Sequence, residues 1–453
     1  MRTTGSASDA LEEFTELLRD EQDFLSPRPS RHMDPAVRRK RRRRRLIAVA
    51  VVATLVLGLN GAYVGWALTA PVGDAVATSR VPASTTPAAA AIVLPREGAA
   101  AISIGGADEY LGPAARGIWL SSGSDEPRAI ASISKLITAL VVLDARPLTS
   151  ADDAGPTLTF DRADHALYDK YYVMGATIAA MPTGSSMSLR DALATMLIPS
   201  ACNYAEAVAD WAFGSQWAFV EATRRWLAAH GLAHTTIVEP TGIDPRNAST
   251  PSDLIALGRL AAADPAVAQI VATRSLALPG PGVMYNTNAL LGTEGIMGLK
   301  TGTLLESGSN LLYTATLDVG TPEPLAVVGV MLGGSSKESV TRSVIALLDS
   351  ITRGFVRVPA ATEGTDVGSY STPWGSSARM VLSEDASIFT WSDTPIVATM
   401  KTTTPTRWKD GEVVGSVTWT AGPNTVTVPI EIEGSIRPPT DWWRLTHPSE
   451  LGR

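Results

Sequence analysis

The sequence predicts an α+β protein, in which a mostly antiparallel sheet carries helices and a small all-β domain follows. Residues 97–357 mix helical periods with short apolar runs of strand length, a pattern typical of helices packed on an antiparallel sheet. From Trp374 onward the chain holds six of its eleven tryptophans, in alternating segments separated by turn residues, which indicates a second, all-β domain. Leu46 to Leu68 is an uncharged apolar stretch, long enough to cross a bilayer as a helix.

The N-terminal region predicts a single membrane span with the N-terminus in the cytoplasm. Residues 38–45 are eight consecutive Lys or Arg residues, and no charged residue follows until Asp74. A basic block keeps its side of a span in the cytoplasm. We therefore expect a cytoplasmic basic tail over 1–45, a transmembrane helix in the lipid bilayer over 46–68, and an extracytoplasmic remainder. A cleaved signal peptide is the alternative, but the long leader and long apolar core fit it poorly.

Composition sets the remaining boundaries and excludes some functions. Residues 69–96 are rich in Ala, Thr and Pro and predict an extended linker, while 363–436 is the expected β domain and 437–453 an irregular tail.

Residues 1–45 hold twelve basic and eight acidic side chains, so the formal net charge of −7 leaves −11 for the rest. An acidic bulk argues against nucleic acid as a partner. The only cysteine, Cys202, excludes an intramolecular disulfide and a cysteine-built metal site.

Periodicity within residues 97–357 predicts individual helices and strands. The expected helices span 130–145, 189–213, 216–231, 250–262 and 337–353. The expected strands span 295–301, 310–317 and 325–332. Because these strands follow one another closely along the chain, we expect them to be neighbours in the sheet.

The first candidate functional motif is Ser132-Ile133-Ser134-Lys135 on the helix predicted over 130–145. Residues i and i+3 lie on one face of a helix, so the side chains of Ser132 and Lys135 are adjacent. A serine hydroxyl becomes a good nucleophile when a base takes its proton, and a partly buried lysine near other cations can act as that base. Taken alone, the motif is more often just the polar start of a helix.

The second candidate motif is Lys300-Thr301-Gly302-Thr303, at the end of the strand predicted over 295–301. An edge strand offers free backbone groups that can pair with an extended peptide. Gly302 removes a side chain where a substrate could approach closely. Lys300 supplies positive charge for a terminal carboxylate, and Thr301 supplies a hydroxyl to hold it. The structural alternative is a strand that ends at a turn glycine.

The third motif is Ser200-Ala201-Cys202-Asn203, between the other two along the chain. The Ser200 hydroxyl could pass a proton between Lys135 and a leaving amine. We count Cys202 and Asn203 as candidate substrate contacts. An asparagine three residues after a serine is otherwise an ordinary helix residue. Each motif alone is weak, but the three in this order and context are specific.

In this order the three motifs resemble those of the low-molecular-mass penicillin-binding proteins, specifically the D-alanyl-D-alanine carboxypeptidases. The resemblance covers roughly residues 95–355. It implies a fold like that of penicillin-binding proteins and β-lactamases, in which an antiparallel sheet carries a helical subdomain. It also implies peptidoglycan stem peptides as substrates, β-lactams as covalent inhibitors, and neither a metal nor an organic cofactor.

By position, the resemblance assigns a role to each motif residue. Ser132 is implied to be the acylated nucleophile and Lys135 its base, while Ser200 relays protons. The resemblance also implies that Lys300 and Thr301 bind the substrate carboxylate. The backbone N–H groups of Ser132 and Thr303 are implied to form the oxyanion hole.

Cys202 departs from the Ser-x-Asn pattern of the family's middle motif. Asn203 comes one position later, about 100° around a helix, so it does not replace the missing amide. Cysteine is a weak donor without a carbonyl acceptor, so we expect the loss of a contact to the substrate amide. Two functional hypotheses follow: a membrane-anchored serine D-Ala-D-Ala carboxypeptidase, or a degenerate relative that binds wall peptides or division proteins without turnover.

Overall fold

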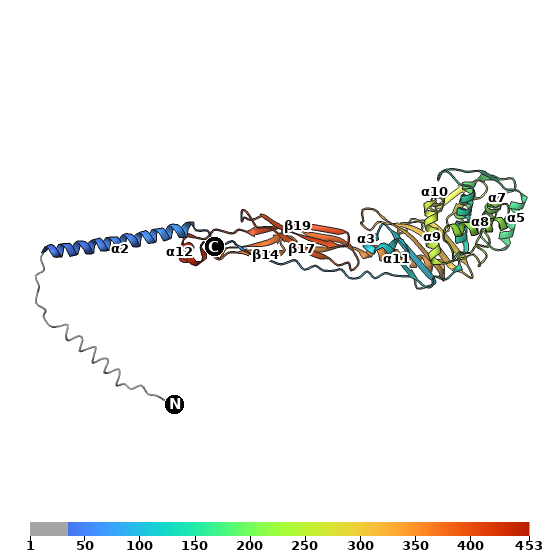
Figure 1. Cartoon of the computed structure of the whole chain (residues 1–453). Coiled ribbons are helices and arrows are strands. Elements are labelled where there is room, and N and C mark those ends of the chain that lie inside the picture. The colour runs from blue at the N-terminus through green and yellow to red at the C-terminus, as the bar shows by residue number, and fades with distance from the viewer. Residues whose placement is uncertain (1–34, 453) are drawn as a thin grey trace, which may run out of the picture. The chain divides into compact units, whose positions relative to one another are not determined.

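The computed structural model describes residues 35–452 (Figure 1). Most of the basic tail predicted over 1–45 therefore lies outside the described residues. The chain divides into two compact units. The first comprises Met1–Val76, Tyr370–Ser377 and Ile436–Arg453, and the second comprises Ala77–Ser369 and Ala378–Ser435.

The first unit is built on helix α2 (Pro35–Thr69). This helix is long and apolar enough to cross a membrane, because an unbroken apolar run follows its basic first turns. The C-terminal segment, predicted to be irregular, contains the short helix α12 (Asp441–Thr446). Tyr63 donates a hydrogen bond of 2.7 Å to the carbonyl oxygen of Leu445, and Arg444 donates one of 2.7 Å to that of Ala70. Arg444 therefore satisfies a carbonyl group at the C-terminal end of α2, and Leu445 accepts a hydrogen bond from the side of that helix.

The second unit contains a five-stranded sheet in the order β10-β11-β12-β2-β3, and all of its pairings are antiparallel. The strands are β2 (Ala99–Gly105), β3 (Leu120–Ser122), β10 (Ile296–Leu304), β11 (Gly308–Leu317) and β12 (Leu325–Gly334). The three strands predicted from the sequence are neighbours as expected. Strand β10, which carries the Lys300 motif, lies at the edge of this sheet.

Both faces of this sheet pack against other elements. Successive side chains of a strand point to opposite faces, so one strand contributes to two cores. On one face, Ile102 and Ile104 of β2 pack in a core with α11 (Lys337–Gly354). On the other face, Ala101 joins a core formed with the helical subdomain. The α+β fold class, with a helical subdomain on an antiparallel sheet, is confirmed.

The helical subdomain supplies the first and third motifs. Its helices are α4 (Ser134–Ala145), α5 (Arg162–Val173), α6 (Leu189–Leu197), α7 (Cys202–Phe213), α8 (Gln216–Ala229), α9 (Pro251–Ala263) and α10 (Pro265–Val271). A short 3-10 turn, η3 (Ala131–Ile133), precedes α4. The helix predicted over 189–213 is instead two helices, because Pro199 and the positive φ of 73° at Ser200 interrupt it. This break places the third motif at the start of α7 rather than within a helix.

The β region forms a six-stranded sheet in the order β1-β14-β15-β19-β18-β17. Its strands are β1 (Val76–Ser79), β14 (Asp366–Ser371), β15 (Ser377–Leu382), β17 (Val397–Thr402), β18 (Val413–Ala421) and β19 (Asn424–Gly434). A separate pair, β13 (Phe355–Ala361) and β16 (Ala386–Trp391), brings Phe355 and Trp391 into the core beside α11. An all-β region after residue 360 is therefore present as predicted.

The segment predicted as a linker over 69–96 is bound to the second unit along part of its length. Strand β1 joins the six-stranded sheet. The backbone N–H of Ala90 donates to Ser392 Oγ at 2.9 Å, and that of Val93 donates to Ser350 Oγ at 3.0 Å. Residues 76–94 are therefore part of the folded unit.

Candidate active site

The turn before α4 presents Ser132 next to Lys135. Ala131 has a positive φ of 49°, which is uncommon for a residue with a side chain and marks local backbone strain. The Ser134 hydroxyl stabilises this turn by donating to the carbonyl oxygen of Ala131 at 2.8 Å. Ser132 is half-buried, and its Oγ lies 3.0 Å from Lys135 Nζ. The predicted nucleophile and base are thus within hydrogen-bond distance.

Lys135 is fully buried and its amine has three hydrogen-bond partners. Besides Ser132, Nζ lies 2.6 Å from the carbonyl oxygen of Thr241 and 3.3 Å from Cys202 Sγ. These contacts come from three separate segments of the chain. They fix the amine in one position beside the Ser132 hydroxyl.

The third motif starts α7 and contributes its thiol to this cluster. Ser200 is buried, with the positive φ noted above. Within residues 35–452 its hydroxyl makes no direct hydrogen bond. The Cys202 backbone N–H donates to the carbonyl oxygen of Thr177 at 2.8 Å, which ties the start of α7 to the loop after α5. Cys202 therefore lies next to Lys135, at the position where the motif resemblance implies an asparagine.

The Asn203 side chain binds the backbone of Ala179 and makes no hydrogen bond to Lys135 within the described residues. It is completely buried. Its Oδ1 accepts from the backbone N–H of Ala179 at 3.1 Å, and its Nδ2 donates to the carbonyl oxygen of Ala179 at 2.8 Å. The amide that was a candidate substrate contact is therefore used to hold the loop after α5.

Strand β10 passes directly beside the Ser132 turn, and Gly302 permits this approach. A Cβ atom at Gly302 would lie 2.6 Å from the carbonyl oxygen of Ile130 and 3.2 Å from the backbone nitrogen of Ser132. The turn carrying Ser132 therefore requires a glycine here. Thr303, the next residue of the edge strand, is exposed.

Lys300 is almost fully buried on β10. Its Nζ lies 3.2 Å from the carbonyl oxygen of Thr301 and 3.4 Å from Thr287 Oγ1. Burial, followed by the positive charge of Lys135, holds the pKa of Lys300 well below its usual range. Both effects disfavour the ammonium form of Lys300.

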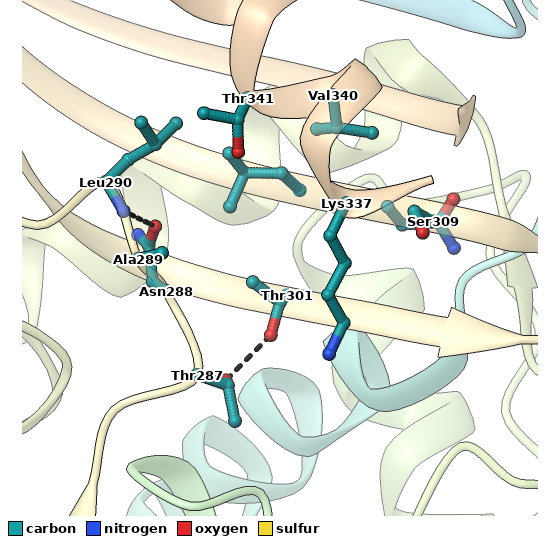
Figure 2. Close-up of a pocket in the computed structure, with 11 residues that line it drawn as sticks. Thr287, Asn288, Ala289, Leu290, Thr301, Ser309, Lys337, Val340 and Thr341 are labelled. Atoms are coloured by element: carbon teal, nitrogen blue, oxygen red, sulfur yellow. Dashed lines mark hydrogen bonds between the residues drawn. The ribbon is translucent and has the colours of Figure 1, made fainter. Parts of the chain in front are cut away.

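A small pocket of about 50 Å³ lies beside Thr301, between β10, β11 and the start of α11 (Figure 2). The Thr301 hydroxyl is hydrogen-bonded to that of Thr287 at 2.7 Å. Lys337 lines the same pocket and is exposed. Figure 2 shows its ammonium group extending toward Thr287 and Thr301. The pocket therefore combines hydroxyl groups with an accessible cation, which suits an anionic group of a ligand.

Comparisons with known proteins cover the segment that contains the three motifs. Residues 115–332 match the profile of a family described as D-alanyl-D-alanine carboxypeptidase. Over this segment the chain is similar to that family. The D-alanyl-D-alanine endopeptidase of Pseudomonas aeruginosa is 32% identical over 197 residues, which are 42% of this chain and 60% of that relative. The chain thus spans less than two thirds of that protein.

Two further similarities involve more of the chain. The D-alanyl-D-alanine carboxypeptidase DacD of Salmonella typhimurium is 27% identical over 271 residues, covering 58% of this chain and 67% of that protein. The solved structure of penicillin binding protein 6B from Escherichia coli superposes with a TM-score of 0.51 at 22% sequence identity. That match covers 78% of this chain and 98% of the solved chain, and it supports the fold.

Three residues of the candidate site could not be found from the sequence. Thr287 follows a β-hairpin and precedes a turn, and no motif marks it. Lys337 follows Ser336, and the pair suggests only the start of a helix. Thr241 contributes its backbone carbonyl, so its side-chain type carries no signal. Each residue reaches the site through tertiary packing.

Proposed function

We propose that the chain is a membrane-anchored, extracytoplasmic serine D-Ala-D-Ala carboxypeptidase that trims peptidoglycan stem peptides through an acyl-enzyme on Ser132. The observation that carries the proposal is the 3.0 Å contact between Lys135 Nζ and Ser132 Oγ, because a nucleophilic serine needs a base within hydrogen-bond reach. The relatives named above are D-alanyl-D-alanine peptidases, which supports peptides ending in D-Ala-D-Ala as the substrate class.

The surroundings of Lys135 suit a proton acceptor. A neutral lysine amine has two N–H groups and one lone pair. The carbonyl oxygen of Thr241 and Cys202 Sγ can each accept one N–H, which leaves the lone pair directed at the Ser132 hydroxyl. In the proposed reaction Lys135 takes that proton as Ser132 Oγ attacks the penultimate D-alanine carbonyl.

The rest of the cycle uses the other motif residues. The proton passes through the Ser200 hydroxyl to the nitrogen of the leaving D-alanine, and the C–N bond breaks. Water then hydrolyses the ester on Ser132. The backbone N–H groups of Ser132 and Thr303 stabilise the negative oxygen of each tetrahedral intermediate. Gly302 supports this role by letting β10 approach the nucleophile turn closely.

The pocket beside Thr301 is the proposed site for the free carboxylate of the terminal D-alanine. The hydroxyl groups of Thr287 and Thr301 can donate hydrogen bonds to it, and Lys337 supplies an exposed positive charge. The buried Lys300 holds these hydroxyl groups in place through its contact with Thr287.

Helix α2 supports the proposed location. It is long and apolar enough to span a bilayer, and the basic run 38–45 lies in its N-terminal part. The positive-inside rule then places the N-terminus in the cytoplasm and the site outside, where peptidoglycan is found.

The alternative is a degenerate family member that binds wall peptides or division proteins without turnover. Cys202 favours it, since a thiol stands where an amide would contact the substrate. The intact pair of Ser132 and Lys135 favours the enzyme. Binding without turnover predicts a site that does not become acylated.

Labelling with a fluorescent penicillin tests the proposal. The purified full-length chain in detergent is the right sample, because residues 76–94 belong to the folded unit. Ser132→Ala should abolish the label, and the exposed Ser124→Ala should retain it. A folded wild type that stays unlabelled, or a label that survives Ser132→Ala, would overturn the acyl-enzyme.

Release of D-alanine separates the two functions. The wild type should release D-alanine from a peptide ending in D-Ala-D-Ala, and Ser132→Ala should not. A wild type that is labelled by penicillin but releases no D-alanine from the peptide would support the binding role instead.

A further inference from the structure

Glu239 is the centre of a hydrogen-bond network in the segment before α9. Its carboxylate accepts from the backbone N–H groups of Thr241 and Gly242, each at 2.6 Å, and from that of Asp244 at 3.3 Å. Asn247 Nδ2 donates to it at 3.0 Å. One carboxylate therefore sets the path of the whole turn, because backbone donors to a charged acceptor form strong hydrogen bonds.

This turn packs directly on the start of α4. The Thr138 hydroxyl donates to the carbonyl oxygen of Pro240 at 2.8 Å. Gly242 has a φ of +82°, and a Cβ atom there would lie 2.0 Å from the carbonyl oxygen of Ala131. The turn therefore contacts η3 at Ala131 and α4 at Thr138, on either side of Ser132 along the chain, and it contributes the Thr241 carbonyl to Lys135.

One peptide group connects the carboxylate to the amine. The carbonyl of Thr241 and the N–H of Gly242 belong to the same peptide unit, which is planar and trans, so they point in opposite directions. Glu239 accepts from that N–H, and Lys135 donates to that carbonyl. Fixing the N–H end consequently fixes the direction of the carbonyl. A hydrogen bond on the N–H also polarises the peptide and strengthens its carbonyl as an acceptor.

We propose that Glu239 is a positioning residue for acylation: it orients the Thr241–Gly242 peptide so that the Thr241 carbonyl holds Lys135 against Ser132. The inference rests on the proposed function, because it concerns the same acylation step. Glu239 does not touch the Ser132 hydroxyl, and its two oxygens are already used by donors of its own turn.

The test compares Glu239→Ala and Glu239→Gln with a matched control in the full-length chain. Asp253 is the control, because it is also a largely buried carboxylate that accepts from a backbone N–H, that of His234 at 2.8 Å. Asp253 has no contact with Lys135 in the described structure, so Asp253→Asn should lower the melting temperature without slowing acylation. Rapid-mixing measurements with a fluorescent penicillin give three constants: dissociation of the first complex, acylation, and hydrolysis of the acyl-enzyme.

Glu239→Ala should slow acylation about tenfold and leave the dissociation constant of the first complex unchanged, since small displacements of a reacting group are costly. Glu239→Gln keeps one acceptor oxygen and the side-chain volume, so it should restore part of the rate. Acylation should stay within about twofold of wild type in Asp253→Asn, because that site does not reach the amine.

Two results would overturn the positioning role. If both Glu239 variants acylate at the wild-type rate, the carboxylate only stabilises the turn. If they acylate normally but fail to hydrolyse the acyl-enzyme, Glu239 acts on the attacking water. An unlabelled wild type would instead overturn the proposed function itself, so the two failures are distinguishable.

Discussion

Replacing Cys202 with asparagine should speed the acylation of Ser132. The thiol lies 3.3 Å from Lys135 Nζ and is buried. An asparagine carbonyl placed there is a better acceptor for the same amine, and its NH₂ group remains free to donate to a substrate carbonyl. A net hydrogen bond contributes about 0.5–1.5 kcal/mol, which corresponds to a rate gain of roughly 2- to 13-fold. The slightly larger side chain should lower stability by no more than about 1.5 kcal/mol.

The assay is the second-order acylation constant with a fluorescent penicillin, measured for wild type, Cys202→Asn and Cys202→Ser. The serine variant keeps the size of the thiol and adds no amide, so it should stay within about threefold of wild type. Melting temperatures establish that the variants are folded. A folded Cys202→Asn that acylates more slowly than wild type would refute the reasoning, and would show that the thiol itself is adapted to this site.

Three further outcomes are expected. Lys337→Met should weaken the binding of peptides with a free terminal carboxylate by about 3- to 10-fold, since it removes a roughly 1 kcal/mol ion pair. The exposed Lys401→Met should leave binding unchanged, and an equal effect of both would refute a specific subsite. Asn203→Ala should destabilise the chain by about 2 kcal/mol, because two buried backbone groups of Ala179 lose their partner; an unchanged melting temperature would contradict this. For Lys300 the folded state has the lower pKa, so the unfolded chain binds more protons up to about pH 10.4. Stability should thus rise with pH in that window by at most about 1.4 kcal/mol per pH unit, and Lys300→Met, followed by thermal unfolding, should flatten the rise.

The sheet could be predicted because its strands are short apolar runs separated by turns, as in β11 and β12. The break between α6 and α7 could not be placed in the same way. Proline at 199 gave a local signal, but the positive φ of Ser200 depends on how that residue packs in the folded domain. The periodicity of apolar residues continues across the break, so the pattern alone suggested one helix.

The candidate site was predictable where side-chain chemistry and helical spacing coincide, as for Ser132 and Lys135. It was less predictable where a residue acts through its backbone or through a distant partner. Asn203 was assigned to a substrate on its type, whereas its amide binds the backbone of Ala179. For Gly302 the sequence correctly suggested a close approach, but the approaching group is the turn carrying Ser132. Neither partner is near in sequence, so a one-dimensional pattern could not identify it.

The C-terminal part of α2 is contacted by residues that lie far along the sequence. Tyr63 and Leu445 are 382 residues apart, and Ala70 and Arg444 are 374 residues apart. During translation α2 is therefore made long before Arg444, which donates to the carbonyl oxygen of Ala70. A stop codon or a proteolytic cut before residue 440 leaves the three sequence motifs intact and yet uncovers Ala67 and Ala70, which are otherwise buried against Leu451.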